Sequence, residues 1–410
     1  MKSTDNVSNI VKNKVVGGAL EGVRVLDLTI AYNGPFCTMN LADHGAEVIK
    51  IERPKTGDQT REWPPFKDGA SGYYAFLNRN KKGLTLNLRS EKGNFIFREL
   101  VKTADVVVNN FKPGTMEKLG IGYDVLRDIN PGIIYASSSG FGSYGPLSNR
   151  PAYDNIAQAL GGMMSITGYP DGPPVKIGPA VGDNFTGTYM SLAIAMALYR
   201  REKTGIGQQL EVAMVDTVIS ILEGAVIQYT LKGEMNGRVG NIDPYTSPFD
   251  MYECKDGYIV IAAASQNLWE DLCRAMGKPE LIDDPDLTTT QLRVENYFTK
   301  LKPIFVEWTA GYTVAELQKI LETKGIPHAP VLNIEQMVNH PNTEAREMVV
   351  EVEDPVLGTI RVPGVPIKMF GTPGSVSAPA PLLGQHNAEI LASLGIEQEK
   401  MQEFEEKGII

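Results

Sequence analysis

The first half of this 410-residue chain alternates strand and helix signals, and this alternation restricts the fold more strongly than any other feature. Runs of branched apolar residues predict strands over residues 23–29, 46–53, 84–88, 104–111 and 132–142. Helix-forming stretches lie between them, over residues 34–45, 91–104 and 115–130. Strands that alternate with helices form parallel sheets joined by right-handed crossovers. We therefore predict an α/β fold with a parallel sheet, in which ligands bind beyond the carboxyl ends of the strands.

A second unit follows after Ala225, where the composition changes. Residues 228–257 are rich in Gly, Pro and polar side chains, as a linker or a long connection is. The pattern beyond them predicts a strand over 257–264 and helices over 267–277, 294–312 and 313–325. Residues 359–370 form an extended segment in this interpretation, and a pair of helices ends the chain.

Composition and charge argue against several classes of protein. A net charge of -10 and a pI of about 5.1 disfavour a nucleic-acid binder, which needs a broad basic surface. No apolar run is long enough to cross a bilayer, and residues 1–18 lack the apolar core of a signal peptide, so we interpret them as a solvated arm. The 3 cysteines and 4 histidines are scattered without metal-ligand spacing. We expect a cytoplasmic protein with no metal, disulfide or membrane partner.

The turn after the first predicted strand does not support a dinucleotide site. It reads IAYNGPF, whereas a pyrophosphate cradle needs the closely spaced glycines of GxGxxG. A Walker-type GxxxxGK[ST] segment is also absent from the sequence. An NAD-dependent dehydrogenase is therefore disfavoured.

A basic stretch nevertheless suggests a phosphate ligand. Residues 50–92 contain ten Lys or Arg against five Asp or Glu, in an otherwise acidic chain. Arg53 and Arg89 follow predicted strands, where a phosphate would dock, and residues 78–82 add Arg79, Lys81 and Lys82. A solvated basic face explains the same residues equally well. Asn110, Phe111 and Lys112 end another strand and could hold an adenine ring and its phosphate, or could simply connect the strand to a helix.

Two carboxylates stand out as candidate catalytic groups. Asp183 lies between small-residue turns, after Gly182 and before an apolar helix that we expect over residues 191–201. A carboxylate at a helix start is stabilised by free N–H groups, so Asp183 should be ionised at neutral pH. Helix capping is the ordinary role of such a residue, and it is also the default role of Asp154. If the two carboxylates lie close together, one pKa will be raised.

Seven motifs, in order along the chain, carry a family resemblance. They are LEGVRVLDLT, GAEVIKIERP, NRNKKGLTLNL, NNFKPG, YDNIAQALGG, KTGIGQ and PLLGQHNAEIL. From about Leu20 to Ile410 the sequence resembles the family III CoA-transferases, the group related to formyl-CoA transferase and carnitine CoA-transferase. The resemblance implies transfer of coenzyme A from an acyl-CoA to a free carboxylate, with CoA as a substrate and no prosthetic group.

The resemblance also assigns residues and domains. It places the family's nucleophilic aspartate at Asp183. It places the CoA contacts at Tyr32, Asn33, Arg53, Leu86, Arg89, Asn110, Phe111, Lys112, Lys118, Tyr153 and Asp154. It implies a large Rossmann-like domain of residues 1–225 and 375–410, and a smaller α+β domain of residues 246–345. Linkers would cover residues 226–245 and 346–374, and two chains would form an interlocked-ring homodimer.

Departures from the family pattern bear on the substrate. The glycine-rich loop of the formyl-CoA transferase branch is missing from residues 240–257, and Tyr32 stands where that branch has glutamine. The pattern is closer to members that use succinyl-CoA and dicarboxylates, such as succinate–hydroxymethylglutarate CoA-transferase. Two alternatives remain: an acyl-CoA racemase of the same fold, disfavoured because Tyr153 replaces its histidine, and a CoA-binding protein without catalysis.

Overall fold

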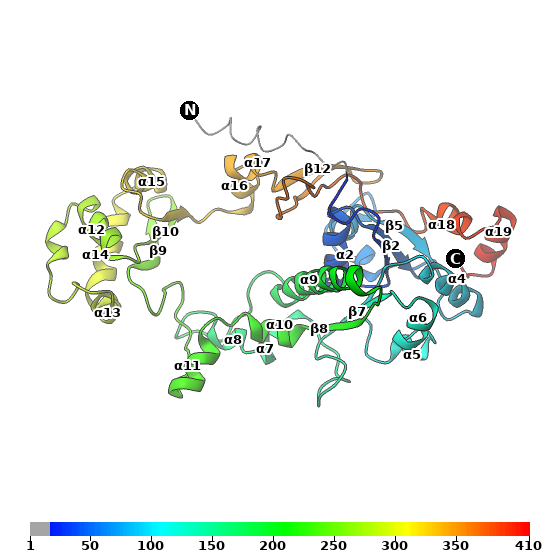
Figure 1. Cartoon of the computed structure of the whole chain (residues 1–410). Coiled ribbons are helices and arrows are strands. Elements are labelled where there is room, and N and C mark those ends of the chain that lie inside the picture. Colours follow the sequence, from blue (N-terminus) through cyan, green and yellow to red (C-terminus); the bar gives the residue numbers. More distant parts are fainter. Residues whose placement is uncertain (1–16) are drawn as a thin grey trace. The chain divides into compact units, whose positions relative to one another are not determined.

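The computed structural model describes residues 17–410, and its main sheet has six parallel strands in the order β5–β2–β1–β6–β7–β8 (Figure 1). The strands are β1 (Arg24–Asp27), β2 (Glu47–Glu52), β5 (Lys82–Thr85), β6 (Val106–Asn109), β7 (Ile134–Ser139) and β8 (Gln209–Ala213). The predicted α/β fold with a parallel sheet is confirmed. β8 is absent from the predicted strands, and nearly all of the predicted N-terminal arm lies outside the described residues.

The described chain divides into two compact units. The larger unit comprises the described residues up to Met163 together with Ile177–Glu223 and Pro341–Ile410, and the smaller unit comprises Met164–Lys176 and Gly224–His340. The helices of the larger unit are α2 (Asn33–Asp43), α3 (Gly72–Asn78), α4 (Glu91–Val101), α5 (Thr115–Lys118), α6 (Tyr123–Ile129), α7 (Asp154–Leu160), α9 (Val181–Thr204), α10 (Met214–Ser220), α17 (Pro341–Ala345), α18 (Asn387–Ser393) and α19 (Gln398–Glu406). Short elements complete it: the strand pairs β3 (Phe66–Lys67) with β4 (Ala70–Ser71) and β12 (Val349–Asp354) with β13 (Gly358–Pro363), and the 3₁₀ turn η1 (Gln59–Glu62).

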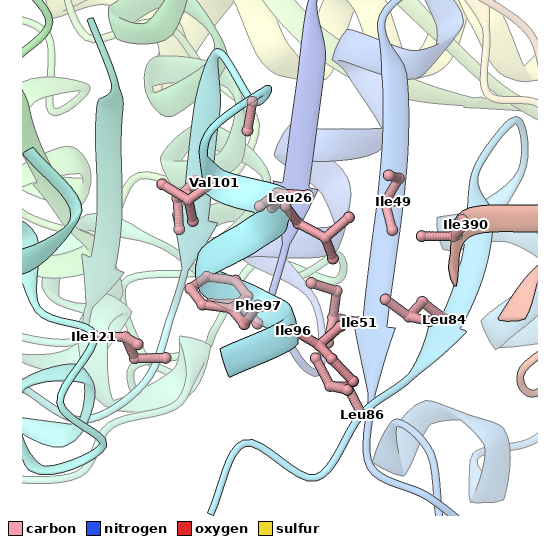
Figure 2. Packing of buried hydrophobic residues seen from close by; sticks show 14 of the residues in the cluster. Leu26, Ile49, Ile51, Leu84, Leu86, Ile96, Phe97, Val101, Ile121 and Ile390 are labelled. Atoms are coloured by element: carbon pink, nitrogen blue, oxygen red, sulfur yellow. The ribbon is translucent and has the colours of Figure 1, made fainter. Parts of the chain in front are cut away.

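Residues alternate between the two faces of the main sheet, because successive side chains of a strand point in opposite directions. In β1, Leu26 packs into a cluster with α4, whereas Val25 packs on the other face with α2 and α9. Figure 2 shows the first cluster, where Phe97 of α4 and Ile390 of α18 meet strand residues from β1, β2 and β5. Each fully buried aliphatic side chain of this kind contributes roughly 2 kcal/mol. The C-terminal helices therefore belong to the fold of the first sheet.

The smaller unit is built around an antiparallel sheet in the order β11–β10–β9. Its elements are α11 (Ala225–Lys232), β9 (Phe249–Cys254), β10 (Gly257–Ala262), α12 (Gln266–Ala275), η2 (Pro279–Ile282), α13 (Thr290–Glu295), η3 (Tyr297–Leu301), α14 (Lys302–Ala310), α15 (Val314–Glu322), β11 (His328–Pro330) and α16 (Ile334–Val338). α8 (Met163–Ile166) stands at the boundary between the units in sequence. The fully buried Trp269 and Phe305 belong to the core of the smaller unit.

Several predicted boundaries differ from the structure. The expected linker at 226–245 contains most of α11, and the expected linker at 346–374 contains the β12–β13 hairpin. β9 lies within the stretch that we interpreted as a connection, because its residues FDMYEC stand between Gly-rich and Pro-rich turns. Among the described residues no single helix is long and apolar enough to cross a membrane, although α10 and α11, taken together across a bend, meet that length and composition.

Candidate active site

Asp183 lies in the first turn of α9, eight residues before the predicted helix start at 191. The helix begins at Val181 although Asn184, Thr186 and Gly187 are poor helix formers, because this turn packs closely against α2. A side chain at Gly187 would place its Cβ 2.6 Å from the backbone oxygen of Asn33. The N-cap is Ala180, so Asp183 is not the capping residue that the local sequence suggested as its ordinary role.

A second carboxylate, that of Asp154, accepts a hydrogen bond from the first turn of this helix. Asp154 Oδ1 accepts a hydrogen bond from the backbone N–H of Gly182 at 2.8 Å, and Asp154 Oδ2 accepts one from Gln158 Nε2 at 2.6 Å. Gln158 in turn accepts a hydrogen bond from the backbone of Ile177 at 2.9 Å. Both Asp154 oxygens are thus bonded to the protein, and its side chain is buried. Asp154 fixes the backbone next to Asp183.

The Asp183 carboxylate accepts a hydrogen bond from Asn33 Nδ2, at 2.9 Å from Oδ1. Burial raises the pKa of Asp183 to about 6; the Asn33 hydrogen bond opposes this rise and the charge of Asp154 adds to it. The two carboxylates therefore interact, as the sequence suggested they would if they met. Asp183 is still mostly ionised at pH 7, but it is a stronger base than an ordinary aspartate.

Aromatic side chains lie beside this carboxylate. The ring of Tyr32 stacks on Phe36 at 5.7 Å and meets the edge of Tyr73 at 6.0 Å, and Tyr73 meets Trp63 at 5.3 Å. Burial and the charge of Asp183 raise the pKa of Tyr73 to about 12, so this phenol remains protonated. Tyr32 donates its hydroxyl hydrogen to Asn184 Oδ1 at 2.7 Å. Tyr73 and Trp63 are not among the predicted site residues, although the aromatic-rich segment 63–76 between two strands is a usable signal.

A cleft of about 1390 Å³ lies at the carboxyl ends of the central strands. Its wall includes residues that follow β1, β2, β5 and β6, in agreement with the expected position of a ligand in such a sheet. Five of the predicted CoA contacts line it, namely Arg53, Leu86, Arg89, Phe111 and Lys118. None of its five cations forms an ion pair with a carboxylate of residues 17–410; they are Arg53, Lys55, Arg89, Arg98 and Lys118. The cleft therefore carries positive charge that a phosphate ligand can neutralise.

The cleft and Asp183 are joined by a short path of hydrogen bonds. Ile30 lines the cleft, and its backbone N–H and C=O bond the side chain of Asn110 at 2.8 and 2.7 Å. Asn110 Nδ2 also donates to Asn33 Oδ1 at 3.1 Å, and Asn33 donates to Asp183. A ligand in the cleft would thus lie on elements that also position the carboxylate.

The family model for CoA-transferase family III matches residues 20–387. This chain belongs to CoA-transferase family III. It is 44% identical to a succinyl-CoA:mesaconate CoA-transferase of Haloarcula hispanica, over 92% of this chain and 97% of that protein. It is 39% identical to the human succinyl-CoA:glutarate CoA-transferase, over 91% of this chain and 85% of that protein. A solved CaiB/BaiF family structure from Brucella suis superimposes with a TM-score of 0.83 at 34% identity, over 93% of this chain and all (100%) of the other.

The family assignment confirms the predicted reaction class. The protein is a CoA-transferase, which moves coenzyme A from an acyl-CoA to a free carboxylic acid. The remaining predicted contacts of this CoA-transferase do not line the cleft. Tyr32, Asn33 and Asn110 lie in the hydrogen-bonded surroundings of Asp183, whereas Lys112 is exposed and Tyr153 is 69% exposed before α7.

Two of the three cations in the basic segment 78–82 are buried in ion pairs. These two can neither bind a phosphate nor form a solvated basic face. Arg79 is buried and paired with Asp43 at 2.7 Å, and Lys81 is buried and paired with Asp27 at 3.0 Å. Lys82 is partly exposed and pairs with Glu47 and Glu389. Their partners lie far away in sequence, which is why the local charge count could not reveal them.

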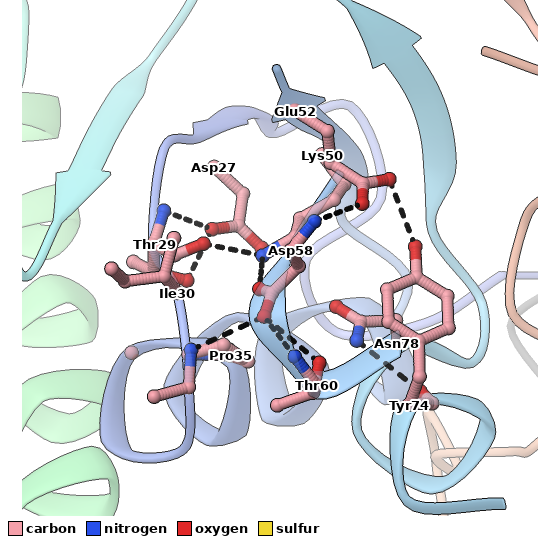
Figure 3. A network of polar contacts seen from close by, with 12 residues as sticks. Asp27, Thr29, Ile30, Pro35, Lys50, Glu52, Asp58, Thr60, Tyr74 and Asn78 are labelled. Carbon is pink, nitrogen blue, oxygen red and sulfur yellow. Dashed lines mark hydrogen bonds and ion pairs between the residues drawn. The ribbon is translucent and has the colours of Figure 1, made fainter. Parts of the chain in front are cut away.

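The Lys81–Asp27 pair belongs to a buried polar network beside the cleft, and Figure 3 shows Asp27, Lys50 and Asp58 of this network. Lys50 Nζ donates to Asp58 at 2.8 Å and to the backbone oxygen of Thr29. Burial alone would raise the pKa of Asp27, but the charges of Lys81 and Lys50 outweigh it and lower that pKa to about 2. Burial lowers the pKa of Lys81 to about 8 against the attraction of Asp27. The network holds the loops that follow β1 and β2, and residues 28–30 and 53–58 of these loops line the cleft.

Nowhere in residues 17–410 do three or more His, Cys, Asp or Glu side chains gather in a way that could hold a metal ion. Cys37, Cys254 and Cys273 are buried free thiols. Burial raises the pKa of Cys37 and of Cys273 to about 12, so neither is a reactive thiolate at neutral pH.

Proposed function

We propose that this protein transfers coenzyme A from succinyl-CoA to a small dicarboxylic acid by way of an aspartyl-CoA thioester on Asp183. One observation carries the proposal: a partly desolvated carboxylate at the end of a hydrogen-bonded path from a cation-lined cleft. The cleft would hold the phosphates of CoA, and the carboxylate would meet the thioester.

CoA suits the cleft by size and by charge. Arg53, Arg89 and Lys118 would bind its phosphates, since guanidinium and ammonium groups donate several hydrogen bonds to phosphate oxygens. Leu86 and Phe111 give apolar surface for the adenine or the pantetheine arm. At about 1390 Å³ the cleft exceeds the usual volume of a small-molecule pocket, as an extended ligand requires.

The reaction divides into four additions to carbonyl carbons. Asp183 attacks the carbonyl carbon of the succinyl thioester, and the carbon–sulfur bond breaks. CoA thiolate is released, and a mixed anhydride of Asp183 and succinate forms. The thiolate then attacks the aspartyl carbonyl, which releases succinate and forms the aspartyl-CoA thioester. The acceptor carboxylate attacks this thioester and releases the thiolate again. The thiolate finally attacks the acceptor's acyl carbon, which frees Asp183 and gives the new acyl-CoA, so the thioester energy is retained.

The relatives support a dicarboxylate acceptor. Mesaconate and glutarate, in the names of the two relatives described above, are both five-carbon dicarboxylic acids, and succinate is the four-carbon homologue. Such acids share a second carboxylate that a site can recognise. We therefore propose acceptors of four or five carbons, with mesaconate and glutarate as the first to test.

The proposal includes a homodimer in which the two chains interlock. An exposed apolar stripe runs along α9 at spacings of four and three residues, through Phe185, Tyr189, Leu192, Met196 and Tyr199. A continuous exposed stripe of this kind is typical of an interface, and a second copy of the chain is the partner the family resemblance implies. Because Asp183 lies in the first turn of the same helix, the second copy would also shield the anhydride from water. The free cysteines are consistent with a cytoplasmic location.

Intact-protein mass spectrometry after mixing with succinyl-CoA tests the proposal directly. We expect an adduct of CoA less one water on the wild-type protein, discharged by mesaconate or glutarate with formation of the corresponding acyl-CoA. Asp183→Asn keeps the shape of the side chain but removes the nucleophile, so no adduct should form. An equal adduct on Asp183→Asn would place the covalent chemistry elsewhere. No adduct and no acyl exchange with any donor would refute the transfer route.

A further inference from the structure

The side chain of Asn33 donates a hydrogen bond to Asp183, and the family resemblance implies a contact with CoA for the same residue. We propose that Asn33 positions Asp183, so that Oδ2 is the attacking oxygen, and that the Asn33 N–H stabilises the oxyanion which forms on Oδ1 when CoA thiolate adds to the aspartyl carbonyl. This inference rests on the proposed route through Asp183 and identifies an oxyanion donor for it.

The orientation of the Asn33 amide follows from its neighbours. Its Oδ1 accepts hydrogen bonds from Ser138 Oγ at 2.9 Å and from Asn110 Nδ2 at 3.1 Å. The reverse orientation would direct the NH₂ group of Asn33 at the NH₂ group of Asn110, whose own oxygen is occupied by the backbone N–H of Ile30. Nδ2 of Asn33 must therefore face Asp183, to which it donates.

The two oxygens of Asp183 are consequently not equivalent. Oδ1 accepts the Asn33 hydrogen bond, whereas Oδ2 has no hydrogen-bond partner among the described residues. A hydrogen bond lowers the basicity of the oxygen that accepts it, so the unbonded oxygen is the better nucleophile. The geometry assigns the attack on the thioester to Oδ2.

The same donor serves the later steps. When Oδ2 bonds to the succinyl carbon, Oδ1 becomes the carbonyl oxygen of the mixed anhydride. CoA thiolate then adds to the aspartyl carbon, the carbonyl electron pair moves onto Oδ1, and collapse of this intermediate expels succinate with Oδ2. The acceptor carboxylate adds to the thioester at the same carbon, and charge again forms on Oδ1. The Asn33 N–H, 2.9 Å from this oxygen before reaction, is in place for both additions.

The surrounding structure holds Asn33 in a fixed position, as an oxyanion donor requires. It is the first residue of α2 and only 7% exposed, and its backbone lies directly against Gly187 of α9. The preceding turn includes Ala31 at a φ of 64°, a left-handed conformation that costs a non-glycine residue free energy. The ion pair of Lys50 and Asp58 supports this turn, because Lys50 donates to the backbone oxygen of Thr29. Strain held by a buried network is typical of a site built for positioning.

Steady-state kinetics of Asn33→Ala and Asn33→Leu test the proposal. We expect kcat to fall by about 10²- to 10³-fold, the usual cost of removing one oxyanion donor. The KM for succinyl-CoA should change little, because Asn33 does not line the cleft. In the wild type the Asn33 hydrogen bond lowers the pKa of Asp183, so its removal should raise that pKa. The acid limb of kcat/KM should therefore move to higher pH. A purely structural role would not move this limb.

Controls separate the possible failures. Asn130→Ala removes three comparable amide hydrogen bonds and should leave kcat and the pH profile unchanged. Two of them are donated to the backbone oxygens of Val101 and Ala104, and one is accepted from the backbone N–H of Gly132. If the wild type forms the CoA adduct but the Asn33 variants keep wild-type kcat, this inference is overturned and the aspartyl route stands. If the wild type forms no adduct, the proposed function fails first. Should neither Asn33 variant fold, Ser138→Ala decides, because freeing the amide orientation should lower kcat several-fold and a wild-type kcat would contradict the proposal.

Discussion

Two groups of cations in the larger unit have the same residue types but opposite surroundings. Arg53, Lys55 and Arg89 line the cleft without carboxylate partners, whereas Lys50 and Lys81 are buried in ion pairs with Asp58 and Asp27. Lys50 and Arg53 are only three residues apart in sequence. Their environments differ because Lys50 lies within β2 and its side chain is buried, whereas Arg53 follows the last residue of β2 and is exposed.

The difference shows what each group can contribute. A buried charge needs an oppositely charged partner, because the free energy of removing it from water is large and unfavourable. Lys50 and Lys81 therefore serve to hold the loops in place. An unpaired exposed cation costs little and remains free for a phosphate. Charge counted along the sequence cannot separate these roles, but burial and pairing do.

The largest effect should come from breaking a buried pair. Lys81→Met leaves Asp27 buried without its nearest cation, and it also removes hydrogen bonds to Thr38 and Asn78. We expect the free energy of unfolding to fall by about 3–5 kcal/mol, measured by urea denaturation at pH 7. A loss below about 1 kcal/mol would show that the pair is not important to the fold and would weaken the contrast.

Asp183 is a third case, a partly buried carboxylate without a cation. Burial raises its pKa from the ordinary value of 3.8 to about 6, so ionising this carboxyl group destabilises the fold. This cost is absent below about pH 4, grows as the pH rises through 6, and is complete above pH 7. Asp183→Asn should therefore be more stable than the wild type by about 3 kcal/mol at pH 8 and nearly equal to it at pH 4. Denaturation curves at both pH values test this, and a pH-independent difference would be inconsistent with the raised pKa.

A cleft cation should affect binding and leave stability alone. Arg89 is exposed, and its backbone N–H rather than its guanidinium bonds Asn87. Arg89→Ala should raise the dissociation constant for CoA about tenfold, with a weaker dependence on salt, while the unfolding free energy stays within about 0.5 kcal/mol. Calorimetric titration at two salt concentrations measures both binding effects. Unchanged affinity would remove Arg89 from the proposed phosphate site.

The sequence predicts the parts of this molecule that depend on local patterns. Five strands of the sheet, β1, β2, β5, β6 and β7, follow from runs of apolar residues, because buried parallel strands need them on both faces. β5 (Lys82–Thr85) overlaps only the start of the predicted strand at 84–88. β8 was missed because QLEVA carries polar residues at the sheet edge. The early start of α9 depends on Gly187 meeting the backbone of Asn33, a contact between segments about 150 residues apart that no local propensity encodes.

The candidate site shows the same limit. Asp183 and the cleft arginines stand out in the sequence because their neighbours are glycines and strand ends. The Asn33–Asp183 hydrogen bond and the burial of Lys81 depend on tertiary partners. The sequence therefore left Lys81 open between a phosphate site and a solvated basic face, and the family resemblance implied only a CoA contact for Asn33. Prediction fails where a residue's role is decided by what lies opposite it in space.

The smallest effect concerns a cation that resembles Lys81 in its bond length alone. Lys102 pairs with Glu99 at 2.7 Å, shorter than the 3.0 Å between Lys81 and Asp27, but its side chain is 55% exposed. Solvent screens this pair, and holding two long side chains together costs entropy, so Lys102→Ala should change the unfolding free energy by less than about 0.5 kcal/mol. Urea denaturation in the same series measures it. A loss as large as that of Lys81→Met would mean that distance rather than burial sets the contribution of an ion pair in this protein. A negligible loss, beside a large one for Lys81, would establish that burial decides which cations hold the fold and which remain available to a ligand.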